Sequence, residues 1–159
     1  MSRNRIADLQ LRGSTSPLPV RVYWPAQAAS QPVPVLVFCR VGAGAGPQAE
    51  ATCRSLSEDL GLLVLSVSCL AGAPDGTTVL EWAAEHAAEL GGNPGRLMIA
   101  GQGAGGAVAA AVAAQARVRG WPPVTDLPEA VQRSLSAGSD EFPGAGSSAL
   151  TNKSAEETR

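Results

Sequence analysis

The segment Leu97–Gly106 most constrains how this chain can fold. It reads Leu-Met-Ile-Ala-Gly-Gln-Gly-Ala-Gly-Gly, and an alanine-rich run follows it to Ala116. A short apolar run, glycines that permit a tight turn and then strong helix formers predict a strand, a turn and a helix in direct succession. Gly103 stands at the apex of the predicted turn.

Apolar patterning in the rest of the chain predicts two strands followed by three strand–helix units. Alternation of strands with amphipathic helices indicates a largely parallel α/β sheet. Gly61 suits the left-handed position that ends a helix. The strands are expected over residues 6–11, 18–23, 35–39, 62–67 and 96–100, and the helices over residues 48–60, 77–90 and from the glycine turn to about 119.

The chain divides by composition near residue 123. Residues 1–123 carry the strand and helix patterns and are predicted to form the folded domain. A short helix is expected over residues 126–135, with Asp126 as its cap and Pro128 in its first turn. Residues 137–159 are rich in Gly, Ser, Ala, Glu and Thr and are predicted to be a disordered tail.

Bulk composition excludes several classes of partner. A hydrophobic fraction of 45% and a charged fraction of 16% are typical of a globular chain. The net charge of −2 argues against non-specific binding to nucleic acid or to an anionic membrane. No apolar stretch reaches the roughly 18 residues that span a bilayer, and the amino terminus lacks the apolar core of a signal peptide. A cytoplasmic location is therefore expected.

Five further observations concern segments whose residue patterns match one known family: Pro19–Ala26, Pro34–Phe38, Val64–Asp75, Trp82–Pro94 and Arg96–Ala111. Together these segments resemble the hormone-sensitive-lipase-like branch of the α/β-hydrolases, a family of carboxylesterases. The resemblance spans about residues 6–123 and implies a partial α/β-hydrolase sheet.

The turn at Gly103 departs from this family at the position that matters most for catalysis. The family has a Gly-x-Ser-x-Gly turn whose serine attacks the ester, with an acid and a histidine base downstream. Gly103 aligns with that serine and has no side chain, and no histidine follows His86. The resemblance therefore implies a degenerate, truncated relative without ordinary hydrolase activity.

The loop that would stabilise an oxyanion also differs from the family pattern. Arg40 aligns with the histidine of the family's His-Gly-Gly-Gly motif, and Val41, Gly42 and Ala43 align with its glycines. Backbone N–H groups of Val41, Gly42 and Ala104 are the expected oxyanion donors, because the family builds its oxyanion hole from backbone groups in these two places.

An active enzyme remains the alternative. Cys39 and Cys69 fall at the carboxyl ends of predicted parallel strands, where a thiolate with its pKa lowered by Arg40 could act as nucleophile. A Ser68–His86 pair, with Asp75 nearby, is a second arrangement that would supply a nucleophile and a base. Another chain could also supply the missing acid and base.

Metal, disulfide and nucleotide chemistry find less support in the sequence. The three cysteines, at 39, 53 and 69, show no Cys-x-x-Cys spacing, so neither a metal nor a disulfide framework is expected. Gly101, Gly103 and Gly106 match the dinucleotide fingerprint Gly-x-Gly-x-x-Gly. The second strand and acidic residue that this motif needs do not follow, because prolines intervene before Asp126. No cofactor is therefore predicted.

The strand Leu97–Ala100 predicts an interaction surface. In the family this strand is interior, but here the strands that would flank its far side are missing. An uncovered strand edge presents unpaired N–H and C=O groups to other chains. We therefore expect self-association or a protein partner along this edge.

Overall fold

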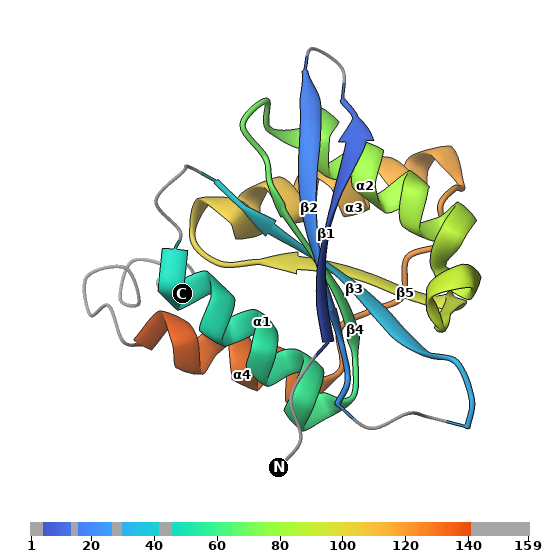
Figure 1. Ribbon diagram of the computed structural model, residues 1–159. Coiled ribbons are helices and arrows are strands. Elements are labelled where there is room, and N and C mark those ends of the chain that lie inside the picture. The colour runs from blue at the N-terminus through green and yellow to red at the C-terminus, as the bar shows by residue number, and fades with distance from the viewer. Residues whose placement is uncertain (1–4, 14–15, 27–29, 42–45, 141–159) are drawn as a thin grey trace, which may run out of the picture.

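The computed structural model describes residues 5–13, 16–26, 30–41 and 46–140, which form a mixed sheet with helices on both faces (Figure 1). The strands are β1 (Arg5–Arg12), β2 (Pro17–Trp24), β3 (Val33–Arg40), β4 (Leu63–Ser68) and β5 (Gly92–Gly101). The helices are α1 (Gly46–Leu60), α2 (Ala73–His86), α3 (Ala104–Arg119) and α4 (Glu129–Asp140), with a 3₁₀ turn over Ala87–Leu90.

The sheet has the strand order β1-β2-β4-β3-β5. Strands β4, β3 and β5 are parallel, as the alternating pattern predicts, whereas β1 and β2 join them in antiparallel pairings. The chain passes from β3 through α1 to β4, and then back across β3 through α2 to β5. The direction of winding therefore reverses at β3, and open α/β sheets bind ligands at the carboxyl ends of strands beside such a reversal.

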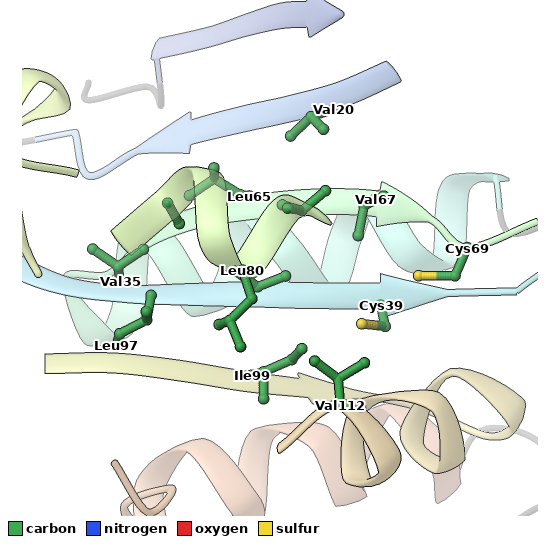
Figure 2. Packing of buried hydrophobic residues seen from close by; sticks show 14 of the residues in the cluster. Val20, Val35, Cys39, Leu65, Val67, Cys69, Leu80, Leu97, Ile99 and Val112 are labelled. Carbon is green, nitrogen blue, oxygen red and sulfur yellow. The ribbon is translucent and has the colours of Figure 1, made fainter. Parts of the chain in front are cut away.

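Strict alternation of side chains divides the core into two layers. Val35, Val37 and Cys39 face one apolar cluster, which α2 and α3 cover and which Figure 2 shows. Leu36 and Phe38 face the other cluster, which α1 and α4 cover. Successive strand residues point to opposite faces, so a strand buried on both sides reads as a continuous apolar run. That is the pattern of residues 35–39.

Helix α2 and strand β5 begin earlier than predicted. Helix α2 starts at Ala73, with Pro74 in its first turn, and the helical pattern ends at His86 before the 3₁₀ turn. Proline is well suited to the first turn of a helix because the N–H that it lacks has no partner there. Strand β5 starts at Gly92, because Gly92 already pairs with Val33 of β3. Gly61 has a φ of +69°, as predicted.

The last helix differs most from its prediction. Helix α4 starts at Glu129, beyond Pro128, and continues to Asp140. Asp126 does not cap it; its carboxylate instead accepts a hydrogen bond from Arg117 at 3.2 Å. Residues 137–140 are helical rather than part of the predicted tail, and residues 141–159 lie outside the described residues. In the part of the chain that the structure describes, no helix is long and apolar enough to cross a membrane.

Candidate active site at the turn between β5 and α3

The predicted strand–turn–helix unit is present, with Gly103 at its apex between β5 and α3. Gly103 has φ 57° and ψ −129°, a conformation that costs most residues strain and glycine little. The turn is closed by hydrogen bonds from Gly105 N–H to the Gln102 carbonyl at 2.9 Å and from Gly106 N–H to the Gly103 carbonyl at 3.0 Å. A Cβ atom added at Gly103 would meet nothing within 4 Å. The apex of the turn therefore has space for a side chain, although the residue there is a glycine.

Close packing explains another of the glycines that follow the apex. A Cβ atom at Gly105 would collide with the carbonyl oxygen of Cys39 and would lie 3.3 Å from the Cα atom of Arg40. The start of α3 thus rests directly on the carboxyl end of β3. A Cβ atom at Gly101 would in turn collide with the backbone of Gly105, so close packing accounts for this fingerprint glycine without a nucleotide. Between α3 and α4 the described chain forms no strand, so the second half of the dinucleotide motif is also missing.

His86 lies at the wrong end of the sheet to act on this turn. It ends α2, which starts beside the carboxyl end of β4 and spans 14 residues, or about 21 Å at 1.5 Å per residue. Its Nδ1 is 3.0 Å from the Trp82 carbonyl oxygen, and its ring stacks on Trp82 with centroids 4.6 Å apart. Ser68 ends β4 at the opposite end of the sheet. The geometry thus argues against the hypothetical Ser68–His86 pair.

Asp75 has a structural partner. Its side chain is buried, and its Oδ2 accepts a hydrogen bond from the backbone N–H of Ala71 at 2.8 Å. This contact ties the turn after β4 to the first turn of α2. A carboxylate in the first turn also interacts favourably with the helix dipole. Asp75 therefore stabilises the entry to α2.

The thiols of Cys39 and Cys69 are brought together but sealed from solvent. Their exposed fractions are 0% and 1%, and both belong to the cluster under α2 and α3 (Figure 2). A hydrogen bond between them raises the pKa of Cys39 and lowers the pKa of Cys69. A Cβ atom at Gly76 would lie 3.5 Å and 3.8 Å from the two sulfur atoms, so α2 packs directly over them. An ester has no open path to either sulfur.

Arg40 points to the other face of the sheet, away from the side chain of Cys39. Its Nε donates a hydrogen bond to Ser66 Oγ at 2.8 Å. Ser66 also contacts Cys53 on the α1 face, where burial raises the pKa of the Cys53 thiol to about 12 against the opposing effects of Ser66 and Arg40. Side chains alternate along a strand, so adjacent residues of β3 cannot share a face. The arrangement in which Arg40 sits beside Cys39 and activates it is therefore wrong, although the charge of Arg40 contributes weakly to the lowered pKa of Cys69.

The predicted oxyanion donors are only partly described. Val41 follows β3 and is 45% exposed, and Ala104 is the first residue of α3. The first N–H groups of a helix have no partner within it, so the role of the Ala104 N–H as an oxyanion donor stays a prediction. Gly42 lies outside the described residues. Among the described residues, no group of His, Cys, Asp and Glu side chains is arranged to hold a metal ion.

Comparisons with known proteins identify the family to which this fold belongs. A family model described as the alpha/beta hydrolase fold matches residues 38–156. The chain is 32% identical over 132 residues to Esterase LipI of Mycobacterium tuberculosis, covering 76% of this chain and 41% of that protein. It is 36% identical over 118 residues to Carboxylesterase NlhH of the same species, covering 67% of this chain and 37% of that protein.

Solved esterase structures superpose on most of the chain. A hyperthermophilic esterase from the archaeon Pyrobaculum calidifontis matches with a TM-score of 0.68 and 28% identity, over 76% of this chain and 43% of the other. EstE1, a thermostable carboxylesterase cloned from a metagenomic library, matches with a TM-score of 0.69 and 28% identity, over 78% of this chain and 46% of the other. The chain thus spans about two fifths of the length of its curated relatives, and it belongs to the α/β hydrolase fold family, in the branch of the hormone-sensitive-lipase-like carboxylesterases.

Proposed function

We propose that this chain is a non-catalytic member of its esterase family that acts by binding. The observation that carries the proposal is Gly103, a residue without a side chain at the apex of a turn that has room for one. Acyl transfer through a covalent intermediate needs a nucleophile, a base within hydrogen-bond reach and a group that orients the base. The single histidine, His86, is engaged with Trp82 at the far end of α2.

The free thiols support a cytoplasmic location for such a protein. Cys39, Cys53 and Cys69 are all buried and form no disulfide with one another. Disulfides are favoured in oxidising compartments, and thiols are kept reduced in the cytosol. The thiols also belong to the packed core, which is the ordinary role of a buried free cysteine.

A fluorophosphonate probe tests the proposal directly, because it reacts with activated serines and spares ordinary ones. Intact-mass spectrometry of the native protein is expected to show no adduct after an incubation that labels a working serine esterase completely. A thiol-directed ester probe is expected to label Cys39 and Cys69 only after unfolding. A stoichiometric fluorophosphonate adduct, mapped to one serine by peptide mass, would show that the chain has a nucleophile elsewhere.

The outer edge of β5 supplies a surface through which binding can occur. The N–H and Oγ1 of Thr125 lie 2.8 Å and 3.3 Å from the Leu97 carbonyl oxygen, so the polar groups of Leu97 face away from β3. These groups repeat every second residue in a strand, so those of Ile99 face the same way. Beyond Thr125 the edge borders a groove of about 260 Å³, lined by Val124 and Leu127 among others.

We infer that a second copy of this chain occupies this edge. The Leu97 carbonyl already accepts from Thr125, and an antiparallel pairing about a two-fold axis makes the outward N–H and C=O groups of Ile99 complementary in both copies. The groove also holds one residue of each charge, Arg117 and Asp126, which pair within one chain at 3.2 Å. Around a two-fold axis the two copies can exchange this pair. The edge therefore matches itself in both backbone pattern and charge.

Substituting Ile99 with proline is expected to weaken self-association by about tenfold or more, because each copy loses an outward N–H worth about 1 kcal/mol. Ile99→Val keeps that N–H and is the matched control. Analytical ultracentrifugation across a range of concentrations measures the dissociation constant, and circular dichroism checks that both variants fold. A wild-type protein that stays monomeric at every concentration would mean that the chain between α3 and α4 protects the edge sufficiently.

A further inference from the structure

A second cavity lies on the α1 face of the sheet, and its lining does not include Gly103. Its volume is about 690 Å³, and strands β1 to β4 and the start of α1 all contribute to its walls. Gln10, Tyr23, Arg40, Glu50 and Ser66 are among the residues that line it. Cavities that bind small molecules commonly measure about 300–1,000 Å³. The cavity is therefore large enough for a metabolite.

The charged residues around this cavity are paired, except for Arg40. Arg21 forms two hydrogen bonds with the carboxylate of Asp8, at 2.8 Å and 3.2 Å. Glu50 pairs with Arg54 at 2.8 Å and lies 4.0 Å from Arg21. No carboxylate among the described residues lies within 4.0 Å of the Arg40 guanidinium. Arg40 is thus a half-buried cation without a counter-ion in the described structure.

Ser66 holds Arg40 in a geometry suited to an anion. The bond from Arg40 Nε to Ser66 Oγ uses the side of the guanidinium nearest the strand, and Ser66 is only 3% exposed. The two Nη groups make no hydrogen bond with another described residue. A guanidinium recognises a carboxylate through two parallel N–H···O bonds, and a fixed orientation lowers the entropy lost on binding.

We propose that this cavity binds a small organic carboxylate, with its carboxylate group on the Nη atoms of Arg40 and its apolar part along Tyr23 and Pro19. The side chain of Tyr23 is buried against the sheet and offers an aromatic wall. The carboxylates of Asp8 and Glu50 also line the cavity, so a ligand with two negative charges meets repulsion there. A monoanion with an apolar body fits both Arg40, which has no counter-ion among the described residues, and the remaining lining.

Titration with benzoate, followed by amide chemical shifts of the full chain, tests the site. Benzoate is expected to bind saturably, with shifts at Tyr23, Arg40 and Ser66. Benzamide has nearly the same shape without the charge and is expected to bind at least about tenfold more weakly. Inorganic phosphate is expected to bind more weakly than benzoate. Phosphate binding more tightly than benzoate would overturn the choice of a monoanionic carboxylate.

Substitution of Arg40 separates recognition of charge from general affinity for aromatic compounds. Arg40→Gln is expected to weaken benzoate binding at least about tenfold and to leave benzamide binding unchanged. Arg133→Gln is the matched control, because Arg133 is exposed and pairs with Glu129 on α4. Ser66→Ala keeps the charge of Arg40 but removes the hydrogen bond that orients it, so it is expected to weaken benzoate binding severalfold. This variant also tests the site if Arg40→Gln does not fold. Equal binding of benzoate by the wild type and by both cavity variants would refute the site.

Discussion

The purified chain is expected to hydrolyse p-nitrophenyl butyrate no faster than the uncatalysed background. Removing a catalytic serine or histidine costs about a million-fold in the rate of an acyl-transfer enzyme, because the members of a triad act as a unit. Gly103 supplies no attacking atom. The Nδ1 of His86 contacts the Trp82 carbonyl oxygen, at the end of α2 farther from the Gly103 turn. Oxyanion donors alone leave at most a small residual rate. Initial rates measured over a range of ester concentrations test this expectation.

The thiols provide the control for this measurement. Cys39→Ser and Cys69→Ser are expected to match the wild type, because both sulfur atoms are enclosed by α2 and the sheet. Saturable turnover that survives repurification and disappears in Cys39→Ser would establish a thiol esterase instead. Such an enzyme would also require α2 to move away from the thiols. Fast hydrogen exchange of the Gly76 amide would reveal that movement.

Restoring the family's serine with Gly103→Ser is expected not to restore hydrolysis. The new hydroxyl has room, since no atom lies within 4 Å of a Cβ at this position. A serine without a neighbouring base remains a weak nucleophile. The φ of 57° at Gly103 is unfavourable for any residue with a Cβ, so the variant is expected to lose about 1–3 kcal/mol of unfolding free energy. Ester turnover and denaturant unfolding measure the two effects.

Gly103→Ala separates the backbone cost from the chemistry. It carries the same strain as Gly103→Ser and no hydroxyl, so the two variants are expected to have equal stability and equal background rates. A Gly103→Ser enzyme that is clearly faster than Gly103→Ala would show that a base reaches the turn. That base would be sought by combining Gly103→Ser with His86→Gln, which removes the chain's single histidine.

Local signals in the sequence were sufficient for the elements that position the turn. The apolar run of residues 35–39 predicts a strand buried on both faces, and β3 is one. The glycines after Ala100 predict a turn and a helix, and Gly103 and Ala104 form that junction. Both features can be read from short stretches of sequence. One follows from the backbone freedom of glycine, and the other follows from the spacing of apolar side chains.

Prediction was weakest where distant residues compete for the same groups. Asp126 and Pro128 look like a helix start, but Arg117 of α3 binds Asp126 and α4 begins only at Glu129. The exposed fraction of the Asp126 side chain is 98%, so this choice follows from the route of the chain past β5 and not from burial. Thr125 makes the contact with the β5 edge, and no local pattern indicates it.

The sequence by itself determined the fold class and the glycine at the apex of the turn, because both follow from residue types and short-range spacing around Gly103. Only the tertiary structure decided which polar groups meet. It placed His86 and Ser68 at opposite ends of the sheet, sealed the thiols of Cys39 and Cys69 under α2, and turned Arg40 toward Ser66 and an open cavity. The physical reason is that side chains alternate across a strand and helices run back along it, so neighbours in sequence face opposite layers while residues from separate strands share one.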